Sequence, residues 1–144
     1  MTPLGEEIID WNAFIETRSA LGDAFVRILG YFREDGTKSV AQIENAMRDR
    51  NSAQLVLPAH TLKGEGYQFG ATRLGELAEE IEMAARHYVE IQQGPEELLE
   101  KVVQLRPLFE QTLAALEAEV SPLVERRSAF GNRATATPQF SRYG

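Results

Sequence analysis

Apolar residues recur every three or four positions along most of this sequence, and this spacing limits what the chain can fold into. In one stretch, apolar or small residues follow one another at intervals of 4, 3, 4 and 3, at Leu55, Ala59, Leu62, Gly66 and Phe69. No segment alternates apolar and polar residues for long enough to indicate a strand. The sequence therefore predicts an all-α fold.

Stop and start signals divide the first half of the chain into short helices. Segments at about 10–18 and 21–34 have helical spacing, and Gly36 is expected to close the second of them. Ser39, with Gln42 three residues later, resembles a capping box that would open a separate helix. The apolar face of that helix would carry Val40, Ile43 and Met47.

The second half shows three longer helices. The first should be capped by Asn51 or Ser52 and end at Gly70. The second should be capped by Thr72 and run to about residue 92, and the third should have Pro95 in its first turn. This last helix should run to about residue 120, with a bend at Pro107. Because the connections are short, we expect an antiparallel up-and-down four-helix bundle with an extra short N-terminal helix.

The charge is unevenly spread along the chain. After Glu125 there are no acidic residues, so residues 1–125 carry a net charge of −11 although the whole chain carries −7. The four basic residues that follow are Arg126, Arg127, Arg133 and Arg142. Residues 126–144 have no helical period and are rich in small residues. We therefore expect a domain over residues 1–125 and a basic, disordered tail over 126–144.

Composition excludes several classes of protein. The chain has no Cys, which excludes disulfides and thiolate metal sites, and its two His leave little material for a zinc site. An acidic body argues against nucleic acid as the partner. The sequence has no apolar run of the roughly 20 residues that a membrane span needs, and its N-terminus lacks the order of a signal peptide. These features favour a cytoplasmic protein.

One histidine stands on the exposed face of the helix expected before Gly70. At about 100° per residue, His60, Lys63, Gly64 and Tyr67 fall on the side opposite the apolar residues. A neutral imidazole is a nucleophile that can take a phosphoryl group, and Lys63 would place a cation beside it. Gly64 costs the helix about 1 kcal/mol relative to Ala, but it lets the backbone of another protein approach the ring.

Periodicity alone also fits a simpler interpretation. His60 could be an ordinary surface histidine, with Gly64 and Gly66 serving only helix packing. His87 provides a comparison, since it lies at the edge of an apolar face with no glycine beside it. For His87 the simpler interpretation is preferred.

The next helix supplies a carboxylate opposite His60. In an antiparallel hairpin that turns near Gly70 and Ala71, residues equidistant from the turn face each other, and His60 and Glu82 lie about ten and eleven residues from it. At the margin of the apolar stripe, Glu82 could accept a hydrogen bond from the Nδ1–H group and leave Nε2 free to attack. Glu79 is expected on the solvated side, where it could border a docking face.

The stretch 59-AHTLKGEGYQFGATRLGELAEEIE-82 resembles the histidine-containing phosphotransfer (HPt) domain of two-component phosphorelays. That pattern is A-H-x-L-K-G, then small residues, an apolar residue with Gly-Ala or Gly-Leu, and a helix with a Gln or Glu that hydrogen-bonds the histidine. The matching positions are Ala59, His60, Leu62, Lys63, Gly64, Phe69, Gly70, Ala71, Leu74 and Glu82. Residues 10–35 are similar to the entry helices of the family, so the resemblance covers about residues 8–120.

Three residues depart from the pattern. Glu65 stands where Ser or Ala is usual, and Tyr67 stands where the family has small residues. Because Tyr67 shares the face of His60, it is expected to contact the partner or to narrow partner choice. Pro58 removes one backbone donor and is expected simply to bend the helix.

The resemblance implies a phosphocarrier and not an enzyme. His60 would accept a phosphoryl group from a receiver-domain aspartyl phosphate and pass it to another receiver, with Lys63 offsetting the phosphate charge and Glu82 orienting the ring. Residues that would contact the partner are Gly64, Tyr67 and Glu79. The implied partners are receiver domains of response regulators and hybrid histidine kinases, and Mg²⁺ would belong to the receiver, so the chain needs no metal or cofactor of its own.

Two other interpretations stay open at this point. A helical adaptor could bind or sequester receiver domains without phosphotransfer, with His60 as a contact residue only. A dimeric phosphotransfer domain would build its four-helix interface from two chains. The number of helices in this single chain favours a monomer.

Overall fold

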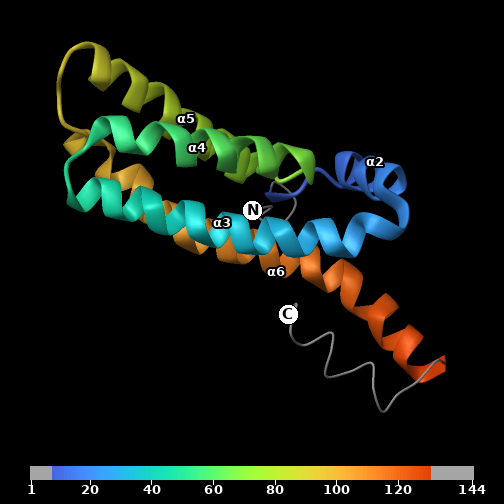
Figure 1. Ribbon diagram of the computed structural model, residues 1–144. Coiled ribbons are helices and arrows are strands. Elements are labelled where there is room, and N and C mark those ends of the chain that lie inside the picture. The colour runs from blue at the N-terminus through green and yellow to red at the C-terminus, as the bar shows by residue number, and fades with distance from the viewer. Residues whose placement is uncertain (1–7, 131–144) are drawn as a thin grey trace.

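The computed structural model describes residues 8–130, with side chains to residue 120. Within this range it has four long helices, preceded by a shorter one. They are α2 (Trp11–Leu21), α3 (Phe25–Arg48), α4 (Ser52–Gln68), α5 (Thr72–Glu90) and α6 (Leu99–Phe130), with 3-10 turns η1 (Gly22–Ala24) and η2 (Glu96–Leu98) before α3 and α6. Helices α3 to α6 lie side by side in alternating directions, and α2 sits at one end (Figure 1). The predicted all-α bundle with a short N-terminal helix is confirmed.

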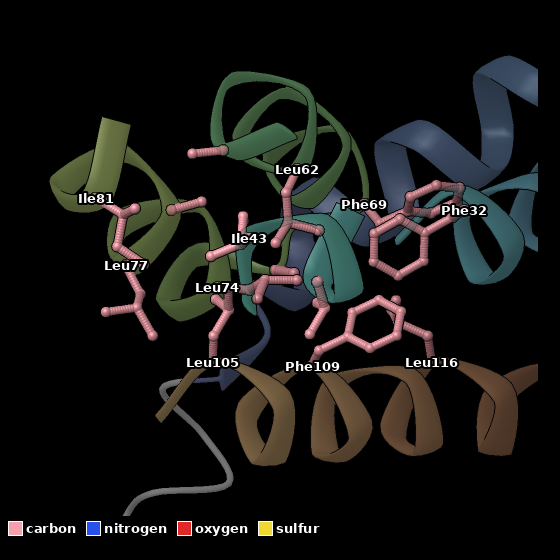
Figure 2. Close-up of a cluster of buried hydrophobic side chains, with 14 of the residues drawn as sticks. Phe32, Ile43, Leu62, Phe69, Leu74, Leu77, Ile81, Leu105, Phe109 and Leu116 are labelled. Carbon is pink, nitrogen blue, oxygen red and sulfur yellow. The ribbon is translucent and has the colours of Figure 1, made fainter. Parts of the chain in front are cut away.

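One hydrophobic core joins the four long helices. Figure 2 shows side chains of α3, α4, α5 and α6 meeting at its centre. The apolar spacing of α4 is satisfied as predicted, since Leu55, Ala59, Leu62, Gly66 and Phe69 are all buried. Phe69 extends the core towards α3, where it meets the Phe25 ring edge-on and the Phe32 ring at a tilt, and Phe25 in turn contacts Phe14 of α2. Burial of one face of α4 leaves its opposite face to solvent.

The predicted break between two helices at Gly36 is wrong. Helix α3 runs without interruption from Phe25 to Arg48, and Ser39 is buried inside it instead of capping a new helix. Gly36 is buried too, and a Cβ added there would lie 2.4 Å from the Phe109 ring of α6. This glycine therefore permits close packing of α3 on α6, a role that helical spacing alone does not distinguish from a helix stop.

The turn between α4 and α5 is tied to α2. Gly70 has a φ of +78°, and its carbonyl accepts a hydrogen bond from the backbone N–H of Asp10 at 2.7 Å. The predicted cap at Asn51 is confirmed, since its side chain accepts from the N–H of Gln54. The predicted cap at Thr72 is wrong: Ala71 holds the cap position without a side-chain bond, and Thr72 is the first helical residue.

The last helix is longer than expected. Helix α6 continues through residues 121–130, past the domain boundary predicted at Glu125. It passes Pro107 as one helix, and the bend predicted there remains a prediction. The tail predicted to be disordered covers residues 126–144. Its residues 126–130 belong to α6, contrary to that prediction, and residues 131–144 lie outside the described range.

Candidate functional site

His60 lies on the solvent-exposed face of α4. Its side chain is 56% exposed, while Ala59 beside it is fully buried. Pro58 is also buried, within a helix that runs from Ser52 to Gln68, so the predicted bend stays a prediction. The ring is therefore accessible to another molecule.

The carboxylate of Glu82 lies directly beside the histidine ring. Glu82 projects from α5, and its Oε2 atom is 3.1 Å from His60 Nδ1. The predicted contact across the α4–α5 hairpin is present. Glu82 is only 3% exposed, so it is more buried than its predicted position at the margin of the apolar stripe indicated.

Two cations share this carboxylate. Lys63 Nζ lies 2.9 Å from Glu82 Oε1, and the Arg86 guanidinium donates to Oε2 through Nε at 3.0 Å and Nη2 at 2.8 Å. We call His60, Lys63, Glu82 and Arg86 the Glu82 cluster. Arg86 was not predicted, although its position four residues after Glu82 on one helix is the signal that would have identified it.

The cluster keeps Glu82 ionised. Burial acts to raise the pKa of Glu82, but the hydrogen bonds from Lys63, Arg86 and His60 outweigh it and lower this pKa from 4.5 to about 2. An ionised carboxylate only accepts hydrogen bonds, so the proton in the His60 contact must be on Nδ1. In the neutral ring the lone pair is then on Nε2, the nitrogen that can attack an electrophile.

Replacing Glu82 by Gln should reveal this ionisation as a change in acid stability. The folded-state pKa lies below the unfolded value, so the carboxylate stabilises the fold above about pH 4.5 and loses this effect as the pH falls towards 2. The stability advantage of wild type over Glu82→Gln should shrink by roughly 2–3 kcal/mol between pH 5 and pH 2. Urea unfolding at both pH values measures it, and an equal advantage at both would contradict the assignment.

Gly64 has no packing reason to be glycine. It is exposed one turn after His60, and a Cβ added there would meet none of the described residues within 4 Å. Gly66 differs, because its added Cβ would lie 3.3 Å from the Gly75 backbone nitrogen of α5. Of these two glycines, Gly66 thus allows α4 and α5 to pack closely, and Gly64 leaves the surface beside His60 without a side chain.

Tyr67 and Glu79, which were also predicted to lie on the docking face, contact each other. The Tyr67 hydroxyl donates to Glu79 Oε1 at 3.0 Å, across the α4–α5 hairpin. Burial and the neighbouring Glu79 raise the pKa of Tyr67, so the hydroxyl keeps its proton. The structure therefore places Gly64, Tyr67 and Glu79 on the face that carries His60.

Glu65, the unusual acid of the motif, meets a second acid. Burial and the charge of Asp35 on α3 raise its pKa from 4.5 to about 7, and the Oε1 atom is buried without a hydrogen-bond partner. Ser or Ala, the usual residue at this position of the HPt pattern, would avoid the free-energy cost of burying a carboxyl group beside another acid. Sequence spacing gave no signal for Asp35, which comes from another helix.

Glu65→Gln should stabilise the protein in a pH-dependent way. A raised folded-state pKa means that stability is fully present below about pH 4.5 and is lost as the pH rises through about 7. Discounted for partial exposure, the gain of the variant over wild type should be roughly 1–2 kcal/mol larger at pH 8 than at pH 4. Thermal or urea unfolding at both pH values tests this, and a gain that does not change with pH would contradict it.

A comparison with protein-family models matches residues 27–119 to the Hpt domain. The chain belongs to the Hpt domain family. The match begins within α3, so the N-terminal helices at residues 10–26, which the sequence resemblance included, lie outside it. No curated protein and no solved structure shows significant similarity to the chain.

Membership settles the general class of the protein. Hpt domains are phosphocarriers in two-component phosphorelays, and they interact with receiver domains. Over residues 8–130, no helix is long and apolar enough to cross a membrane. Among the same residues, no group of three or more His, Asp or Glu side chains lies together as a metal site would require.

Proposed function

We propose that this Hpt protein is a phosphorelay intermediate whose phosphorylated residue is His60. The observation that carries the proposal is the contact of the exposed His60 ring with a buried, ionised carboxylate, 3.1 Å from Nδ1 to Glu82 Oε2. This contact fixes the tautomer that has Nε2 as the nucleophile. It also supports the ring against rotation, while 56% of the His60 side chain remains exposed to solvent.

The transfer forms one bond and breaks one bond. Nε2 attacks the phosphorus of a receiver aspartyl phosphate, the P–O bond breaks, and the aspartate carboxylate leaves. The phosphorylated ring, still protonated at Nδ1, is positively charged, and the adjacent Glu82 carboxylate stabilises it. The reverse steps pass the group to the aspartate of a second receiver.

The cations of the Glu82 cluster would offset the added phosphate charge. The Lys63 and Arg86 side chains are 23% and 53% exposed, so both can turn from Glu82 towards a phosphoryl group on Nε2. Mg²⁺ would be supplied by the receiver, and no cofactor of the chain enters the proposal. We propose that the protein acts as a monomer, because α3 to α6 close one core within a single chain. We also propose that it is cytoplasmic.

A phosphotransfer screen tests the proposal. Receiver domains of the source organism, each phosphorylated and supplied with Mg²⁺, are mixed with the full chain, and phosphate on the chain is measured over time. At least one receiver should label the chain, and a second should remove the label. Tight binding of receivers with no labelling by any of them would contradict the proposal and support the adaptor interpretation.

A further inference from the structure

Tyr67 is held against α5 by two residues. A Cβ added at Gly75 would lie 2.7, 2.8 and 2.9 Å from three carbons of the Tyr67 ring, so the ring lies directly on the bare backbone of α5. One turn further along α5, Glu79 accepts the hydroxyl hydrogen bond at 3.0 Å. We call Tyr67, Gly75 and Glu79 the Tyr67 clamp.

The clamp makes an exposed aromatic ring rigid. Tyr67 remains 41% exposed, one turn beyond Gly64 on the face of His60. A side chain that is already fixed loses little conformational entropy when a partner binds, and exposed Tyr rings are among the residues that contribute most to protein interfaces.

The surroundings of the ring are acidic. Glu76, Glu79 and Glu80 are all exposed on α5, and each of them acts electrostatically on the Tyr67 hydroxyl. Glu80 also pairs with Lys101 Nζ at 3.1 Å, so Glu76 and Glu79 carry most of the argument. A cation above an aromatic ring is attracted by the ring as well as by nearby carboxylates. A Lys or Arg of the partner is therefore the side chain that fits this place best.

We propose that Gly75 is a positioning residue, which holds Tyr67 as a preformed contact for a cationic side chain of the docking receiver domain. The inference rests on the proposed phosphotransfer function and names the chemistry of its partner surface. The Tyr67 clamp would increase the affinity for the receiver. The chemical step belongs to the Glu82 cluster.

Gly75→Ala tests the positioning role. The new methyl group displaces the ring, and because the ring is the exposed end of a side chain, the helix can keep its fold. With the receiver that labels wild type fastest, KM for transfer should rise about tenfold while kcat stays within about twofold. In the Tyr67→Ala background, Gly75→Ala should change KM by less than about twofold, because no ring remains to be displaced.

Matched variants separate the clamp from general effects on helices. Gly30→Ala on α3 is the glycine control, since its added Cβ meets nothing within 4 Å in the described part of the chain, and its KM should equal that of wild type. Glu79→Gln can still accept the Tyr67 hydrogen bond but removes a charge, so its KM should rise at low salt and match wild type at high salt. Tyr67→Phe keeps the ring on Gly75 and should retain most of the affinity.

A measurement on the protein alone tests the geometry. In the full chain, NMR should show cross-relaxation between the Tyr67 ring protons and the Gly75 Hα protons, and Gly75→Ala should remove this contact. An unchanged KM in Gly75→Ala, or an equal rise with and without Tyr67, would overturn the inference while leaving phosphotransfer intact. Failure of every receiver to label wild type would instead overturn the proposed function and this inference with it.

Discussion

His60→Gln is expected to remove phosphoryl transfer to this protein, lowering its rate by at least about a thousandfold. Glutamine is similar in size and polar, but its amide nitrogen has no lone pair available for attack on phosphorus. The wild-type label should be labile in acid and stable in base, as a phosphoramidate is. Labelling by a phosphorylated receiver, followed over time on both proteins, measures the effect.

His87→Gln is the matched control for this experiment. His87 is exposed on α5, where its ring lies 6.0 Å from the Tyr88 ring, and it is outside the Glu82 cluster. Its replacement should leave the labelling rate within about twofold of wild type. Equal labelling of wild type and His60→Gln would refute the assignment of His60.

Gly64→Gln is expected to block transfer by more than about a hundredfold, because a displacement of about 1 Å between reacting groups already costs this much. A Cβ added at Gly64 meets nothing within 4 Å among the residues that the structure describes, so the fold should be kept and helix propensity even improved. The loss would come only from a clash with the partner backbone beside His60. Rates of transfer and circular dichroism together measure the two effects.

Gly30→Gln provides the comparison for Gly64→Gln. Gly30 also lies in a helix with free space around an added Cβ, but it belongs to α3 and not to the α4–α5 face. It should transfer phosphate at the wild-type rate. Normal transfer by Gly64→Gln would show that the bare surface beside His60 is not needed for docking.

Helical spacing and the short α4–α5 connection predicted the parts of the site that lie on this one hairpin. The angular arrangement of α4 placed His60 outside and Leu62 inside, and the length of the hairpin placed Glu82 opposite the histidine; the structure has all three in these places. Such features follow from 3.6 residues per turn and from a short antiparallel connection. They do not depend on how α3 and α6 pack against this hairpin.

Most other contacts between helices were not predicted from the sequence. Gly36 was interpreted as a stop because nothing in the sequence shows that Phe109 packs on it. The sequence alone does not distinguish the roles of Gly75 and Gly64. In the structure Gly75 lies under the Tyr67 ring, whereas a Cβ added at Gly64 has no neighbour among the described residues within 4 Å. The acid pair of Glu65 and Asp35 likewise depends on how α3 meets α4. Partners in packing are set by three-dimensional arrangement, and a single sequence carries little information about it.

The position of phosphate on the protein tests the central claim most directly. The full chain, labelled with ¹⁵N and phosphorylated by its receiver, can be studied by NMR for coupling between phosphorus and the ring nitrogens. The tautomer fixed by Glu82 predicts one phosphoryl group, bonded to Nε2 of His60, with the proton retained on Nδ1. A phosphoryl group on Nδ1, or on any residue other than His60, would contradict the account.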